Sequence, residues 1–198
     1  MDIQPITLTG KTVRLEPLSL SHVPDLFAAS DPSIWKYMLY GDISTEKDME
    51  GWVLDMLNRA KAGADLPFAV ILLSTGRAVG ATRYMDIRPP HKGLEIGGTW
   101  YGSAYHRTAV NTESKFLLLK NAFDKMGCIR VQFKSDSRNE RSIAAIKRIG
   151  AKPEGVLRNH MILPDGTYRH SAYFSILDDE WPGVKKALEE KLGYRLVD

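Results

Sequence analysis

The sequence predicts an α/β protein in which a mixed, mostly antiparallel sheet is flanked by helices. Stretches with helical spacing of apolar residues alternate along the chain with short stretches rich in β-branched and aromatic residues. Two pairs of these strands are joined by short turns, at residues 74–77 and 164–167, and such hairpins make antiparallel neighbours. A strand–loop–helix unit over residues 94–126 adds a crossover, so we expect the sheet to be mixed rather than fully parallel.

The first elements are a strand and a helix. Residues 12–16 alternate apolar and polar side chains and begin the domain as a strand. A helix is expected to carry the apolar residues between positions 23 and 27, and either Ser19 or Ser21 can cap it. Pro24 falls in the first turn of this helix, where a missing backbone N–H is tolerated.

The next segment predicts a second helix followed by a hairpin. Thr45 and Asp48 have the spacing of a capping box and open a helix that extends to about residue 60. Residues 68–73 and 78–85 then read as two strands around the turn at 74–77.

The middle of the chain carries the most informative unit, a strand that runs into a helix. Residues 94–101 form the fourth expected strand, and helical spacing is visible from Thr112 to about Met126. The start of a helix leaves about four backbone N–H groups without partners and carries a positive partial charge, so it binds anions well. This unit therefore indicates a ligand that carries phosphates.

The loop between strand and helix distinguishes three phosphate-binding designs. A P-loop or a dinucleotide fingerprint would require glycines and an order of residues that positions 106–115 do not have. Residues 106–111 instead resemble the pyrophosphate loop of the GNAT acyl-CoA transferases, with both of its glycine positions substituted. Asn111 tolerates left-handed conformations and is expected to offset a missing glycine. An ordinary strand–loop–helix crossover is the alternative for this loop alone.

A second motif lies downstream. A strand over residues 129–134 is followed by a helix that begins near Asn139 and ends at Gly150, with Ser142 in its first turn. This segment resembles the second acyl-CoA motif of the GNAT superfamily, in the branch related to ribosomal-protein N-terminal acetyltransferases of the RimJ/RimL type. The first motif contributes to this resemblance through Val110, Asn111, Thr112, Glu113, Lys115 and residues 117–119. The resemblance extends from about Thr12 to Gly183.

The C-terminal part predicts a second hairpin and a last helix. Strands over residues 156–163 and 168–177 flank the turn at 164–167, and Asp178 or Asp179 caps a helix that ends near Gly193. We expect residues 1–198 to form a single domain with its core over about 12–183.

The resemblance implies a fold and an activity. It implies a sheet that splays between the fourth and fifth strands, with acyl-CoA entering the split. The implied activity is transfer of an acetyl group from acetyl-CoA to a primary amine by direct attack in a ternary complex. Peptide N-termini are the acceptors favoured by the family, and small amines remain alternatives. A homodimer is also expected.

An amine attacks only when neutral, so a base is needed. Glu95 is the leading candidate, because it lies on the fourth strand near the expected split, where related enzymes often place a glutamate. The alternative is a structural carboxylate paired with Arg83 or another neighbour. Asp86, His91 and His160 are weaker candidates for the base.

Ser142 is the candidate that protonates the departing thiolate or hydrogen-bonds the thioester sulphur. Many superfamily members have a tyrosine a few residues further along this helix, but residues 145–147 contain none. Asn139 can bond the pantetheine chain as well as cap its helix. The residues expected to bind the cofactor are Trp100, Tyr101, His106, Arg107, Thr108, Ala109, Val110, Asn111, Thr112, Asn139 and Ser142.

Composition excludes several other classes of protein. The formal charge is +3, with basic and acidic residues interspersed, which argues against a nucleic-acid binder. No apolar run approaches the roughly 18 residues of a membrane span, and the N-terminus lacks the features of a secretory signal. Cys128 is alone, so we expect no intrachain disulfide and no cysteine-based metal site. These observations predict a cytoplasmic protein without a metal.

The sequence is compatible with two other classes of function. A non-catalytic acyl-CoA-binding sensor, or a degenerate transferase, would explain the substituted glycines and the missing tyrosine. A purely structural domain would have no affinity for CoA. Turnover of acetyl-CoA with an amine separates these classes from an enzyme.

Overall fold

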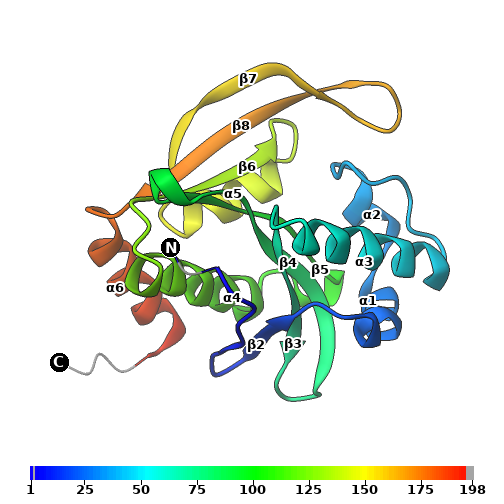
Figure 1. Cartoon of the computed structure of the whole chain (residues 1–198), viewed down its shortest axis with the longest axis horizontal. Helices are drawn as coiled ribbons and strands as arrows, with labels where there is room; N and C mark the ends of the chain where they lie inside the picture. The colour runs from blue at the N-terminus through cyan, green and yellow to red at the C-terminus, as the bar shows by residue number, and fades with distance from the viewer. Residues whose placement is uncertain (2, 195–198) are drawn as a thin grey trace.

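The computed structural model of the chain describes residues 1 and 3–194, and its centre is one mixed sheet (Figure 1). The strand order in this described part is β1-β2-β3-β4-β5-β6-β8-β7. All neighbouring strands are antiparallel except β5 and β6, which are parallel. The strands are β1 (Leu8–Thr9), β2 (Val13–Pro17), β3 (Leu66–Leu72), β4 (Arg77–Arg88), β5 (Gly93–Tyr101), β6 (Arg130–Asp136), β7 (Lys152–Ile162) and β8 (Tyr168–Leu177). The predicted fold class is therefore confirmed.

Helices cover both faces of the sheet, and each face has its own hydrophobic core. Helices α4, α5 and α6 bury side chains in the larger core, and α1, α2 and α3 bury theirs in the smaller one. The helices are α1 (Val23–Ala29), α2 (Pro32–Trp35), α3 (Glu46–Lys61), α4 (Ala109–Lys120), α5 (Glu140–Arg148) and α6 (Trp181–Leu192). No helix in the described ranges is long and apolar enough to cross a membrane.

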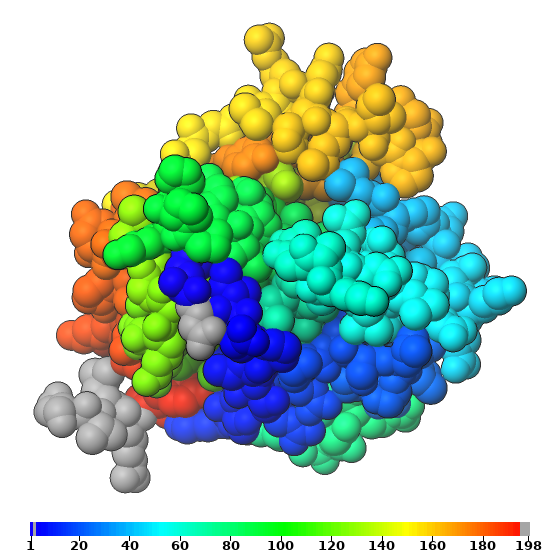
Figure 2. Space-filling model, viewed as in Figure 1, coloured from blue at the N-terminus to red at the C-terminus, as the bar shows by residue number. Residues whose placement is uncertain are grey.

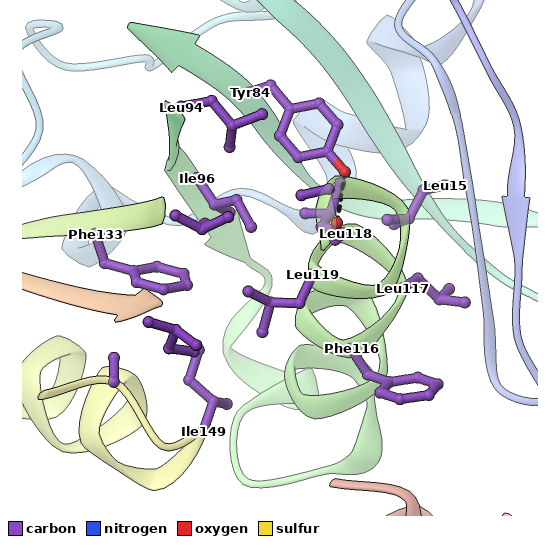
Figure 3. Packing of buried hydrophobic residues seen from close by; sticks show 14 of the residues in the cluster. Leu15, Tyr84, Leu94, Ile96, Phe116, Leu117, Leu118, Leu119, Phe133 and Ile149 are labelled. Atoms are coloured by element: carbon purple, nitrogen blue, oxygen red, sulfur yellow. Dashed lines mark hydrogen bonds between the residues drawn. The ribbon is translucent and has the colours of Figure 1, made fainter. Parts of the chain in front are cut away.

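The larger core packs α4 against the strands on both sides of the centre. Leu118 and Leu119 of α4 point towards Tyr84, Ile96 and Phe133 of the sheet (Figure 3). The hydroxyl of Tyr84 donates a 2.6 Å hydrogen bond to the carbonyl of Leu118 and accepts a 3.3 Å hydrogen bond from Nδ2 of Asn121, so this buried polar atom is satisfied. This packing fixes the position of α4 relative to β4 and β5.

Several expected boundaries were wrong by a few residues. Helix α4 begins at Ala109 rather than Thr112, and it passes into a π-helical turn over Asn121–Lys125. The last helix has Glu180 at its N-cap instead of Asp178 or Asp179. Strand β1 and helix α2 were not predicted, because each has four residues or fewer and too little periodicity to detect. Because β1 precedes the first expected strand, the expected fourth and fifth strands are β5 and β6.

The buried carboxylate of Glu113 joins distant parts of the chain to α4. Its side chain is 1% exposed and accepts hydrogen bonds from the backbone N–H groups of Lys11, Thr12 and Val13, at 2.9, 2.7 and 2.7 Å. The hydroxyl of Tyr194 donates a fourth, at 2.6 Å. A Cβ at Gly10 would lie 2.5 Å from this carboxyl group, so only glycine allows the turn before β2 to approach so closely. We call these four hydrogen bonds the Glu113 clamp.

The β7–β8 hairpin projects from one edge of the molecule, as the yellow and orange ridge in Figure 2 shows. Its inner strand β8 pairs with β6, and its outer strand β7 is mostly exposed. The root of the hairpin therefore lies beside the point where β5 and β6 run together.

Candidate active site

The parallel strands β5 and β6 separate in the middle of the sheet. They pair at only three positions, Gly93 with Arg130, Leu94 with Val131 and Glu95 with Gln132, although both strands continue beyond them. A cavity of about 870 Å³ opens where the pairing stops, and its walls come from β5, β6, α4, α5, β8 and the segment after α2. This volume is within the ~300–1,000 Å³ of typical ligand sites.

A β-bulge shapes the β5 wall of this cavity. Gly98 and Thr99 both lie opposite Thr82 of β4, so β5 has one extra residue at this point. Gly98 has φ +56°, and a Cβ there would lie 3.0 Å from Nε of Arg83, so the bulge requires glycine. Because the extra residue of a bulge is not paired in the ladder, the bulge presents backbone groups to the cavity, which Gly97, Gly98 and Thr99 line.

The start of α4 contributes Arg107 and Asn111 to one end of the cavity. Thr108 is the N-cap, and its Oγ1 accepts a 3.3 Å hydrogen bond from the backbone N–H of Val110. Arg107 adopts the left-handed conformation, with φ +61°, immediately before the cap. Asn111 lies within the helix, so the expectation that Asn111 takes a left-handed conformation was wrong. The chain turns into α4 at Arg107 instead.

The first turn of α5 lies across the cavity from α4. Asn139 is its N-cap, and its Oδ1 accepts a 3.1 Å hydrogen bond from the backbone N–H of Ser142. Nη1 of Arg141 lies 3.3 Å from Nδ1 of His106, whose Nε2 lies 3.1 Å from the carbonyl of Tyr101. These contacts link the starts of α4 and α5 to the end of β5.

The cavity gathers most of the residues expected to form the site. Those that line it are Glu95, Trp100, Tyr101, His106, Arg107, Asn111, Asn139 and Ser142. Four others form the N-cap and first turn of α4 without lining the cavity: Thr108, Ala109, Val110 and Thr112. Trp100 also packs on Trp35 and Trp52 in the smaller core.

Glu95 lies at the last paired position of β5, where the split begins. The residue is 2% exposed; its Oε2 accepts a 3.0 Å hydrogen bond from Nε2 of Gln132, and its Oε1 lies 3.4 Å from Nζ of Lys134. Arg83, the partner considered from the sequence, lies 3.4 Å from Asp65 instead. The carboxylate of Glu95 therefore faces the cavity with β6 side chains as its partners.

The other candidate bases lie outside the cavity wall. Asp86 accepts a 3.0 Å hydrogen bond from Nε2 of Gln132, so it shares this donor with Glu95. His91 is exposed in the turn between β4 and β5. Nδ1 of His160 lies 3.0 Å from Oγ of Ser171, on the hairpin. Among these carboxylates and imidazoles, only Glu95 lines the cavity.

Lys115 lines the cavity but received no role from the sequence. It is one helical turn after Asn111 on α4 and is 6% exposed. Its ammonium donates hydrogen bonds to the hydroxyls of Thr82 and Thr99, and within the described chain it has no carboxylate at ion-pair distance. Burial lowers the pKa of Lys115 to about 7, and the charge of Glu95 opposes part of that shift.

The stability of the protein should therefore rise with pH above neutrality. Between pH ~7 and ~10.4 the unfolded chain holds a proton on Lys115 that the folded protein has released, so the free energy of unfolding increases with pH in this window, by up to about 4 kcal/mol. Below pH 7 both states are protonated, and this cost of burying the charge is fully present. We expect Lys115→Met to be more stable than the wild type at pH 7, by an amount that shrinks towards pH 10.

Denaturant unfolding of both proteins at pH 7, 8 and 9 measures this difference. Lys120→Met, at an exposed position of the same helix, is the matched control. Its free energy of unfolding should differ from that of the wild type by an amount that does not depend on pH. If the difference in free energy of unfolding between Lys115→Met and the wild type is the same at all three pH values, Lys115 keeps an ordinary pKa.

No group of three or more potential metal-ligating side chains occurs in the described residues. The cavity offers buried cations and the carboxylate of Glu95, next to the N–H groups at the start of α4.

Comparisons with known proteins agree with this geometry. The model of the acetyltransferase (GNAT) domain family matches residues 12–152. The structure resembles a GCN5-related N-acetyltransferase from Brucella melitensis, with a TM-score of 0.89, 32% identity, and coverage of 95% of this chain and 86% of that one. The provisionally named ribosomal N-acetyltransferase YdaF of Bacillus subtilis is 25% identical over 183 residues, which are 88% of this chain and 94% of that protein.

The fold also resembles that of Mycobacterium smegmatis RimJ, whose structure is a complex with CoA-disulfide. The TM-score is 0.79 at 17% identity, and the match covers 96% of each chain. At this identity the likeness concerns the fold.

Proposed function

Because the chain belongs to the GNAT family of acetyltransferases, we propose that it transfers an acetyl group from acetyl-CoA to a primary amine by direct attack. The observation that carries this proposal is the cavity between β5 and β6, which connects the start of α4 to Glu95. One end can hold an anion and the other holds a carboxylate, so the two substrates can meet between them.

The residues around the cavity fit an acyl-CoA. The backbone N–H groups at the start of α4, from Arg107 to Asn111, would hold the pyrophosphate, with the side chain of Arg107 adding a contact. The amide of Asn139 would bond the pantetheine chain from the opposite wall. The thioester would then lie near Ser142 and the bulge of β5.

The protonation of the amine decides what the site must do. A free α-amine has a pKa near ~8 and a lysine-type amine near ~10.4, so deprotonation at pH 7 costs roughly 1.4 kcal/mol for the first and roughly 4.6 kcal/mol for the second. An N-terminal amine therefore requires only a modest base, whereas a lysine side chain or a polyamine requires a stronger one.

Glu95 would supply this base and Ser142 would assist the leaving group. The amine nitrogen bonds to the thioester carbonyl carbon, the carbon–sulphur bond breaks, and the proton of the amine passes to Glu95 directly or through water. Gln132 and Lys134 hold the carboxylate in place. The hydroxyl of Ser142 would hydrogen-bond the departing sulphur, which needs little acid assistance because a thiolate leaves readily.

The acceptor is proposed by analogy. The relative YdaF carries the name of a ribosomal N-acetyltransferase, which favours a peptide N-terminus over a small amine. Release of CoA with a panel of peptides, amino acids and polyamines measures this preference and tests catalysis itself. A protein that binds CoA but acetylates none of these amines would be the acyl-CoA sensor considered from the sequence.

Binding of the cofactor should stabilise the fold. CoA at about 100 times its dissociation constant should add roughly 2.7 kcal/mol to the free energy of unfolding. Ala109→Glu places a negative charge in the first turn of α4, so this variant should fold but lose the shift in melting temperature with CoA.

Ala187→Glu, at an exposed position of α6, is the matched control and should keep the shift. A melting temperature of the wild type that does not move with millimolar CoA would overturn the proposed function.

A further inference from the structure

Arg169 is a buried arginine in the wall of the cavity, on the same face of the sheet as Glu95. It is 7% exposed and lies on β8. Its Nε donates a 3.1 Å hydrogen bond to Oγ of Ser171, and its Nη1 donates a 3.3 Å hydrogen bond to the carbonyl of Tyr37 after α2. Two neutral groups therefore hold the guanidinium in position.

The other cations that line the cavity from the sheet have acidic partners, whereas Lys115 of α4 has none among the described residues. Arg83 lies 3.4 Å from Asp65, and Lys134 lies 3.4 Å from Glu95. Asp136, the acid next to Arg169 in the sheet, is held by two hydrogen bonds from the side chain of Arg138, at 3.0 and 2.8 Å.

Arg169 differs from these cations. Over residues 1 and 3–194, no carboxylate lies within 4.0 Å of it, and its Nη2 makes no hydrogen bond to the protein. Asp136 and Glu95 attract this charge only from beyond ion-pair distance. A buried charge without an ion-pair partner is costly, and a guanidinium presents a fork that matches a carboxylate. The wall therefore has a fixed cationic position with donor capacity left for a ligand.

The sheet register gives the distance between this position and the base. Gln132 lies opposite Glu95, and four residues further along β6 Asp136 lies opposite Ser171, which the guanidinium contacts. Four residues of a strand span ~13 Å, so ligand groups that contact Glu95 and Arg169 lie on the order of 10 Å apart. The amine and the carboxylate of a free α-amino acid are too close together to reach both residues.

We propose that Arg169 binds a carboxylate of the acceptor, and that the acceptor is a peptide whose N-terminal amine lies at Glu95 and whose acidic side chain follows within the first few residues. An extended peptide advances ~3.3 Å per residue, so an aspartate at the third position brings its carboxylate to about the required distance. This inference rests on the proposed function and specifies its substrate class.

The test compares two amidated peptides that differ only at the third position, aspartate or asparagine, with the full chain and acetyl-CoA. The wild type should use the aspartate peptide with a KM at least 10-fold lower and a similar kcat, because the contact is made equally before and during the reaction. Equal KM values for the two peptides would overturn the proposal, and this measurement requires no variant.

Variants then locate the preference at Arg169. Arg169→Gln should raise the KM for the aspartate peptide to that of the asparagine peptide, with kcat within about threefold. Arg169→Lys should keep part of the preference, because it keeps the charge but not the fork. Arg158→Gln, at an exposed position of β7, is the control and should behave as the wild type. A preference that persists in Arg169→Gln would assign the carboxylate to another residue.

The structural alternative is that Arg169 only anchors the segment after α2. In that case Arg169→Gln would change both peptides equally, which also overturns the proposal. The stabilisation of each variant by CoA shows, independently of the peptide kinetics, whether the variant is folded and its cofactor site is intact. Failure of the proposed function has a different result, because no amine would then be acetylated, whether or not CoA stabilises the wild type.

Discussion

Glu95→Gln is expected to lower turnover at neutral pH by about 100-fold or more, the usual contribution of a positioned general base. The substitution keeps the size of the side chain and its position at the start of the split, but it removes the group that accepts the proton. The deficit should shrink as the pH approaches the pKa of the acceptor amine, because solvent then supplies the neutral form. Recovery near pH 8 would indicate an α-amine, and recovery well above it a lysine-like amine.

Asp86→Asn is the matched control for this variant. Asp86 receives a hydrogen bond from the same Gln132 amide as Glu95 but does not line the cavity. Its substitution should leave the pH profile of turnover unchanged. If Glu95→Gln instead shows a deficit that is constant across pH, Glu95 is structural and the base must be sought elsewhere. Stabilisation by CoA should persist in both variants.

Glu113→Ala should be the most destabilising single substitution considered. It leaves three backbone N–H groups and the hydroxyl of Tyr194 without their acceptor in a site that is 1% exposed. Lost hydrogen bonds to a charged group, with donors left unsatisfied, should cost about 4 kcal/mol in total. For a chain of this size the melting temperature should fall by about 10 °C.

Glu113→Gln and Glu140→Ala are the comparison variants for this loss of stability. Glutamine keeps one acceptor oxygen but brings an amide group towards donors, so it should recover only a small part of the stability. Glu140 is an exposed glutamate in the first turn of α5, and its loss should change stability by less than about 1 kcal/mol. Similar melting temperatures for Glu113→Ala and Glu140→Ala would show that the Glu113 clamp contributes little.

The sequence predicted elements whose signals are local. The capping box of Thr45 and Asp48 and the cap at Asn139 are both present in the structure, because each depends on residues three apart. The mixed sheet followed from hairpin turns and one crossover. Boundaries failed where local signals compete: the spacing of apolar residues in α4 becomes visible at Thr112, but the cap at Thr108 determines where the helix begins.

The parts of the candidate site that the sequence did not reveal depend on contacts between distant elements. Lys115 belonged to the segment that resembles the family, but only the structure shows that its ammonium meets the hydroxyls of Thr82 and Thr99. Arg169 follows a hairpin turn, where a basic residue is normally solvated. In the structure it is buried and contacts Tyr37, which is 132 residues away in the sequence. The spacing of residues along the sequence does not predict a contact over that separation.

The Glu113 clamp also has a kinetic consequence. Its backbone partners are 100 to 102 residues away from Glu113, so each contact closes a large loop. Because loop closure costs entropy before the contact is gained, such contacts should form after the folding transition state, when the sheet is already assembled. A chevron analysis of Glu113→Gln should then show faster unfolding with nearly unchanged refolding. The clamp would thus determine how long the folded protein persists, rather than how quickly it forms.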